Sequence, residues 1–73
     1  MKKYKGISGN SGVSEYRLGI DRIDIKFQDG SLYTYSYKSA GRDHVEKMKD
    51  LAETGKGLTT YINKYVRELY AVD

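Results

Sequence analysis

The chain has 73 residues, with 13 Lys and Arg against 10 Asp and Glu, a formal net charge of +3, one His and no Cys. This length allows one domain with a small core, since a chain of about 60 residues buries only about 60% of its unfolded surface on folding. The lack of Cys excludes disulfides, thiolate zinc sites and a cysteine nucleophile, and His44 alone cannot supply a two-histidine metal site. We therefore expect no metal and no other cofactor, and dimerisation remains open as a source of stability.

Charge and hydropathy also limit the partners. Basic and acidic residues are interspersed, and a charge of +3 favours nucleic acid only slightly, because each neutralised phosphate needs its own Lys or Arg. No apolar run approaches the ~20 residues of a membrane span, and the N-terminal Met-Lys-Lys-Tyr-Lys is not followed by the apolar core of a signal peptide. We expect a cytoplasmic protein that does not insert into membranes.

The N-terminal residues differ in composition from the rest of the chain. Residues 1–12 combine lysines with glycines, serines and an asparagine, a composition that predicts a flexible basic arm. The spacing Gly6-x-x-Gly9-x-x-Gly12 does not match the dinucleotide-binding fingerprint, so it does not indicate a phosphate site. We treat residues 13–73 as a single domain.

Period-two alternation of apolar residues predicts strands over 13–20 and 22–28. Asp29 and Gly30 then supply a hairpin turn, because glycine accepts the positive φ that such turns require. A third strand is expected over 31–38.

After Gly41 the apolar period changes to about 3.6 residues, which predicts two helices. The first begins near Asp43, a candidate cap, and ends at Gly55, which is placed as a helix C-terminal glycine. The second runs from about Thr59, also a candidate cap, to Ala71. The apolar stripes of these helices are Val45, Met48, Leu51 and Ala52 in the first and Leu58, Ile62, Tyr65, Val66 and Leu69 in the second. The predicted fold is α+β: a three-stranded antiparallel β-meander followed by two helices packed on one face of the sheet.

Tyr33, Tyr35 and Tyr37 occupy alternate positions and therefore share one face of the third strand. The geometry of the preceding turn decides which face this is. A two-residue loop would place Tyr33 opposite Lys26, so that the rings lie among charged side chains and form an exposed aromatic platform.

A three-residue loop with Gly30 in the left-handed conformation gives the other outcome. It pairs Tyr33 with Ile25 and Tyr35 with Ile23, so that these rings join the core. At ~25 cal/mol per Å2 and 150–250 Å2 per ring, burial of two tyrosines contributes several kcal/mol to a small core. This comparison favours the buried arrangement, with Tyr37 the most exposed of the three.

Several short motifs resemble those of the KTSC domain family. They are Ser11-x-Val13, Tyr16, the strand ending in Phe27, Gly30, Tyr33-x-Tyr35 and Tyr61-Ile62-Asn63-x-x-Val66-Arg67. The resemblance covers about residues 11–70. The family includes small stand-alone bacterial proteins and the C-terminus of some lysyl-tRNA synthetases, so the resemblance implies a bacterial, cytoplasmic protein and suggests RNA as a ligand.

Exposed tyrosines could stack on unpaired bases while nearby cations contact phosphates. Residues two apart on a strand are separated by about 6.6 Å, which suits the splayed bases of single-stranded RNA. The candidate nucleic-acid-binding residues are Tyr33, Tyr35, Tyr37, Arg22, Lys26, Asn63, Lys64 and Arg67. The alternative is that the tyrosines are core and the cations form an ordinary surface, with Lys64 and Glu68 spaced for a helical ion pair.

No residue pattern indicates catalysis. His44 follows Asp43 directly, and neighbours on a helix diverge by about 100°, so this pair does not form an acid-base couple. We expect a non-enzymatic binding module with single-stranded RNA as its candidate ligand. The alternative is a module for protein-protein contact or homodimer formation that uses an exposed sheet face or edge strand.

Overall fold

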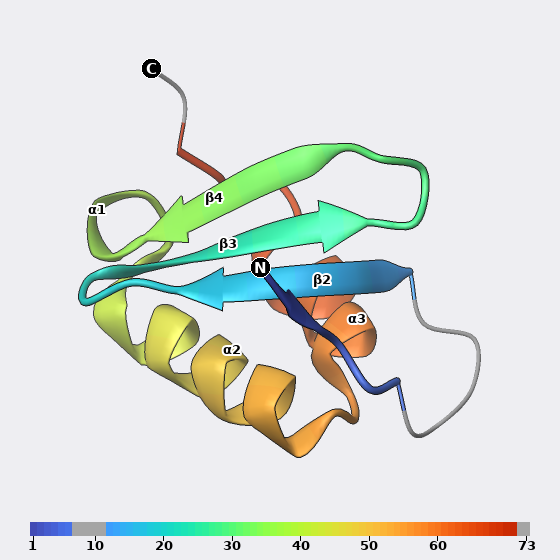
Figure 1. The fold of residues 1–73 in the computed structure, drawn as a ribbon. Helices are drawn as coiled ribbons and strands as arrows, with labels where there is room; N and C mark the ends of the chain where they lie inside the picture. Colours follow the sequence, from blue (N-terminus) through green and yellow to red (C-terminus); the bar gives the residue numbers. More distant parts are fainter. Residues whose placement is uncertain (7–11, 72–73) are drawn as a thin grey trace.

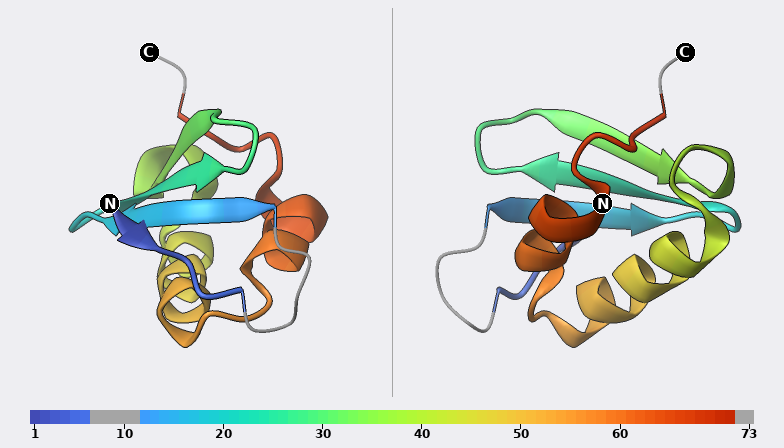
Figure 2. Two further views of the ribbon diagram at one scale, coloured as in Figure 1. Left: turned by 45° about the vertical axis from the view of Figure 1, so that its right-hand side comes forward. Right: turned by 180° about the vertical axis from the view of Figure 1, so that it is seen from behind.

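The computed structural model describes residues 1–6 and 12–71 and shows an α+β fold with one four-stranded antiparallel sheet. The strands are β1 (Lys2–Lys3), β2 (Val13–Leu18), β3 (Arg22–Phe27) and β4 (Leu32–Ser36), in that spatial order. The helical segments are α1 (Tyr37–Ala40), α2 (Arg42–Thr54), α3 (Leu58–Tyr61) and the π-helical η1 (Ile62–Val66). Helices α2 and α3 lie on the same side of the sheet (Figures 1 and 2). Among the described residues, no helix is long and apolar enough to span a membrane.

The core lies between the sheet and this helical layer. Alternate side chains of β3, Ile23 and Ile25, are fully buried there, as the period-two pattern predicts. The helices contribute Val45, Met48, Ala52, Leu58, Ile62 and Val66 to the same cluster. These six residues belong to the predicted apolar stripes, so the helical periodicity identified the helical part of the core correctly except for Ala40.

The β3–β4 turn has the three-residue geometry that burial favours. Ile25 pairs with Tyr33 and Ile23 with Tyr35, the Phe27 N–H donates to the Ser31 carbonyl at 2.9 Å, and Gly30 has a φ of 91°. The Tyr35 side chain is only 1% exposed. The prediction of a buried tyrosine stripe is therefore confirmed for Tyr35, and the exposed aromatic platform is wrong.

The N-terminal residues belong to the fold, contrary to the expectation of a flexible arm over 1–12. Lys2 pairs with Tyr16 and Lys3 with Glu15, which adds β1 as a fourth strand. Tyr4 is 7% exposed, and its hydroxyl accepts a hydrogen bond of 3.1 Å from the Leu58 N–H at the start of α3. The sheet therefore has four strands instead of three; residues 7–11 lie outside the described part of the chain.

Helix α2 ends as predicted, at Gly55, where φ is 83° and the N–H donates to the Leu51 carbonyl. Its N-terminal cap is Gly41 instead of Asp43, which lies in the first turn. The predicted second helix is preceded by Gly57 and begins at Leu58, so the expected cap at Thr59 is also wrong.

The second helix ends at Val66, well short of Ala71, and its last part is π-helical. A π segment has more residues per turn than an α-helix, so the 3.6-residue stripe no longer lies on one face. Ile62 and Val66 remain buried, but Tyr65 in the π segment is 51% exposed, and Leu69, which lies beyond the end of η1, is also exposed; both had been assigned to the apolar stripe. The chain then passes the edge of the sheet, where the Ala71 N–H donates to the Thr34 carbonyl at 2.7 Å.

Two predicted strands are shorter than expected. Strand β2 ends at Leu18, and Ile20 in the following turn is 93% exposed. Strand β4 ends at Ser36, whose hydroxyl accepts a hydrogen bond from the Ser39 N–H, while the Ser39 hydroxyl accepts one from the Ser36 N–H. This capping box starts α1 and places Tyr37 in a helix instead of a strand.

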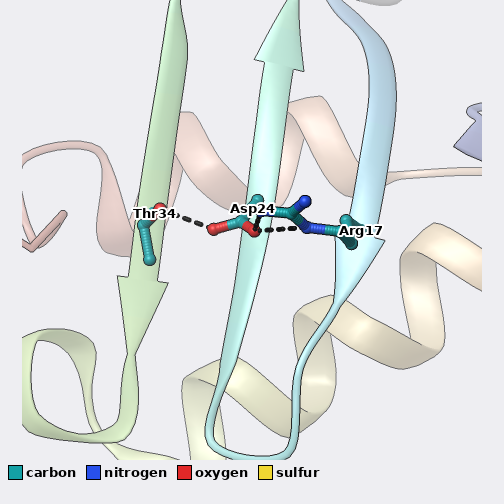
Figure 3. A network of polar contacts seen from close by, with 3 residues as sticks. All are labelled: Arg17, Asp24 and Thr34. Carbon is teal, nitrogen blue, oxygen red and sulfur yellow. Dashed lines mark hydrogen bonds and ion pairs between the residues drawn. The ribbon is translucent and has the colours of Figure 1, made fainter. Parts of the chain in front are cut away.

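The face of the sheet turned away from the helices carries a polar network across three strands (Figure 3). The buried Asp24 carboxylate accepts hydrogen bonds from Arg17 Nε at 3.0 Å and from the Thr34 hydroxyl, and Arg17 Nη2 lies 2.9 Å from the same carboxylate oxygen as Nε. This arrangement satisfies the charge of Asp24 within the protein. The hydrogen bonds and ion pair of Arg17, Asp24 and Thr34 therefore occupy the centre of this face, and none of these three side chains is aromatic.

Burial of Tyr35 predicts a loss of stability at high pH. Burial raises the pKa of Tyr35 from 10.0 to about 12, and the neighbouring Tyr33 and Tyr70 phenols add to the effect. The unfolded chain therefore releases this proton first, so the stabilisation is complete below pH 10 and is lost as the pH rises toward 12. The full loss is at most on the order of 2 kcal/mol, because solvent near the half-buried phenol weakens the effect. Urea unfolding at increasing pH should show this decline, and Tyr35→Phe should flatten it; equal slopes for both proteins would contradict the prediction.

Candidate binding groove

A groove of about 560 Å3 opens between the β3–β4 turn and the residues that follow η1. We call it the turn groove. Its aromatic wall consists of Phe27, Tyr33 and Tyr70, which come from β3, β4 and the C-terminal segment. Its floor includes the buried Tyr35 and Ile62. The groove thus combines residues that are widely separated along the chain.

The three rings of the aromatic wall contact one another in sequence. Phe27 and Tyr33 meet edge to face with centroids 5.6 Å apart, and Tyr33 and Tyr70 are tilted with centroids 4.9 Å apart. Tyr33 is half-buried and Tyr70 is exposed at the rim. The three inclined rings therefore offer apolar surface to a ligand, and Phe27 and Tyr33 are also packed against the core.

Charged and polar side chains line the same groove. Asp29 lies in the turn, and Asn63, Arg67 and Glu68 lie on and beyond η1. The Asp29 carboxylate accepts hydrogen bonds from the Ser31 hydroxyl at 2.6 Å and the Ser31 N–H at 2.9 Å, and these bonds lower the pKa of Asp29. Asp29 is therefore an anion at neutral pH, and the groove carries two carboxylates and one guanidinium.

The structure brings three of the eight candidate nucleic-acid-binding residues together as accessible groove residues: Tyr33, Asn63 and Arg67. Tyr35 also reaches the groove, but as its buried floor, where its hydroxyl makes a long hydrogen bond of 3.5 Å to the Arg67 carbonyl. Tyr35 is thus not exposed for base stacking, because the register of the hairpin turns its ring toward the helices.

The other candidates lie on separate surfaces. Tyr37 is half-buried in α1, and its hydroxyl donates to Glu46, which raises the pKa of Tyr37. Lys26 lies on β3 opposite Leu32, and the Lys64 ammonium lies 5.5 Å from the centre of the Tyr65 ring. Arg22 borders a second hollow along the outer edge of β4, which shares Tyr33 and Tyr70 with the turn groove. Lys26, Tyr37 and Lys64 line neither hollow.

Of the aromatic and charged residues that line the groove, four were missed as candidates: Phe27, Asp29, Glu68 and Tyr70. The three-residue turn already places Phe27 near Tyr33, so this ring contact could have been inferred from the hairpin. Glu68 and Tyr70 had no comparable signal, because the apolar periodicity continues past the residue at which the helix ends.

A second ring cluster joins α2 to the following helical segments. The His44 Nδ1 is hydrogen-bonded to the Tyr61 hydroxyl at 2.7 Å, and the Tyr61 and Tyr65 ring centroids are 4.8 Å apart. Burial is the main cause that raises the pKa of Tyr61. His44 is half-buried, not exposed as a first-turn helical position would suggest. Within the described residues, no group of three or more His, Asp or Glu side chains could hold a metal ion.

Comparison with known proteins finds no matching family model, no matching curated protein and no matching solved structure. The resemblance to the KTSC domain family remains a prediction.

Proposed function

We propose that this chain is a small non-enzymatic module that binds an extended protein segment in the turn groove. The observation that carries the proposal is an aromatic wall of Phe27, Tyr33 and Tyr70 with the carboxylates of Asp29 and Glu68 lining the same groove. This combination of flat rings and negative charge suits a ligand that is both apolar and basic.

Aromatic-lined grooves bind extended segments well, because such segments present side chains to the rings without first breaking a helix or strand of their own. Proline rings and aromatic side chains pack on the faces of tyrosines, and Arg or Lys can lie over such a face as a cation–π pair. The carboxylates of Asp29 and Glu68 favour the same cations. The expected ligand is an extended segment in which Arg or Lys stands near Pro or an aromatic residue.

RNA is less well matched to this site. Each phosphate needs a cation, but the groove offers Arg67 beside two carboxylates, one of which is held ionised by its hydrogen bonds to Ser31. Lys26 and Lys64 lie elsewhere, Arg22 borders the adjoining hollow beyond Tyr33 and Tyr70 instead of the groove, and Tyr35 is buried. Electrostatic complementarity therefore favours a basic peptide over a polyanion.

The test is selection from phage-displayed random peptides with the full chain immobilised. Enriched peptides should combine Arg or Lys with Pro or aromatic residues. Tyr70→Ala should weaken binding of a selected peptide by roughly 30-fold, the effect of removing an aromatic anchor. Glu68→Gln should weaken binding several-fold and reduce its salt dependence. Tyr65→Ala is the matched control, because this exposed tyrosine lies on η1 outside the groove, and it should leave binding unchanged.

Two results would overturn the proposal. In one, no peptide is enriched, or the enriched peptides bind the Tyr70→Ala and wild-type chains equally well. In the other, a pool of short single-stranded RNA binds in place of peptides and loses affinity on Arg67→Gln. The second result would restore RNA as the ligand of the same groove.

A further inference from the structure

The two edges of the sheet are protected very differently. Edge strand β1 has two residues, both lysines, and short charged edges resist pairing with another strand. Edge strand β4 reads Leu-Tyr-Thr-Tyr-Ser, without a charge, proline or glycine. Its sequence has the high β-propensity and low charge that are typical of strands that pair with copies of themselves.

The outward backbone groups of β4 can be identified from its hydrogen bonds to β3. The Ser31 carbonyl accepts from Phe27 and the Tyr37 N–H donates to the Asp21 carbonyl, so alternate positions between them face β3. Leu32 and Thr34 therefore turn their backbone groups away from the sheet, whereas the Ser36 N–H is already bonded to the Ser39 hydroxyl in the capping box of α1. The Leu32 side chain is 58% exposed, and a hollow of about 580 Å3 runs along this edge.

The C-terminal segment already uses this edge. The Ala71 N–H donates to the outward carbonyl of Thr34 at 2.7 Å, and Tyr70 contacts Tyr33 through its ring. The segment follows η1 toward β4 (Figure 2). An outward carbonyl of β4 thus accepts a backbone donor of the kind that an added strand would bring.

We propose that the outer edge of β4 is a self-pairing surface through which two copies of the chain join, and that residues 69–71 compete for it. Antiparallel pairing of two β4 strands about Thr34 sets the Thr34 N–H of each copy opposite the Thr34 carbonyl of the other. Thr34 then faces its own copy and Leu32 faces Ser36. Because β4 carries no charge, the pairing brings no like charges together, unlike a pairing through the lysines of β1.

Ala71→Pro tests the competition directly, because proline lacks the N–H that binds Thr34. Sedimentation velocity over a concentration series should show a monomer–dimer equilibrium for the unchanged chain. In the Ala71→Pro chain, the dimer dissociation constant should fall roughly fivefold, the order expected for loss of one hydrogen bond. Ala71→Gly keeps the N–H and should match the unchanged chain.

Leu32→Lys tests the edge itself. A lysine at this exposed position protects the strand as the lysines of β1 do, and the dimer should disappear. Ile20→Lys is the matched control: it removes an even more exposed apolar side chain, from the β2–β3 turn, and should leave the dimer unchanged. The proposal is overturned if the Ala71→Pro chain is monomeric at all concentrations, or if a dimer forms that Leu32→Lys does not weaken. Peptide binding in the turn groove is measured separately, so either result leaves that proposal intact.

Discussion

Tyr35→Ala should lower the free energy of unfolding by about 3–5 kcal/mol, the usual cost of deleting a buried aromatic side chain. The Tyr35 ring is fully enclosed between the sheet and the helical layer, and its hydroxyl reaches the Arg67 carbonyl. A core of this size supplies only about 3–5 kcal/mol in total. Circular dichroism and urea unfolding should therefore show a largely unfolded chain at 25 °C.

Tyr65→Ala provides the comparison for this prediction. Tyr65 is half exposed on η1. Apart from the loss of its contacts with neighbouring rings, its replacement by alanine should change the free energy of unfolding by no more than about 0.5 kcal/mol. If Tyr35→Ala is tolerated as well as Tyr65→Ala, Tyr35 does not face the core and the two-residue hairpin loop is the correct one. The pair of variants therefore tests the hairpin register in solution.

The hairpin could be predicted from sequence because its two possible registers differ strongly in buried apolar area. Only the three-residue loop gathers Ile23, Ile25, Tyr33 and Tyr35 on one face, and the structure has this register. Helix α2 could be predicted for a similar reason, since its apolar period and Gly55 indicate the same end point. In both cases a local pattern and the demand for burial agree.

The missed features depend on contacts between distant residues. Tyr4 looks like part of a polar arm until its partner, the Leu58 N–H, is known. The end of the second helix was placed too late, because a π turn at Ile62–Val66 and the pairing of Ala71 with Thr34 leave no trace in the apolar period. The turn groove depends on this ending, since Tyr70 reaches Tyr33 only where the helix has already stopped.

Tyr4→Ala should also cost about 3–5 kcal/mol, although Tyr4 lies in the first few residues of the chain. Two losses add in this variant. The buried ring leaves the core cluster, and the Leu58 N–H, which begins α3 without a side-chain cap at Gly57, loses the phenol oxygen that accepts its hydrogen bond. Urea unfolding followed by circular dichroism should show the loss of stability.

Tyr4→Phe separates these two contributions. It keeps the ring and removes only the acceptor, so it should cost about 1–3 kcal/mol, the penalty for a buried N–H without a partner. Lys3→Ala is the control for a mere change in the N-terminal strand and should be close to neutral, because Lys3 is exposed. If Tyr4→Ala were as mild as Lys3→Ala, the N-terminus would be a loose arm after all. A large cost for Tyr4→Ala with a smaller one for Tyr4→Phe would instead show that this residue holds the first strand to the start of α3.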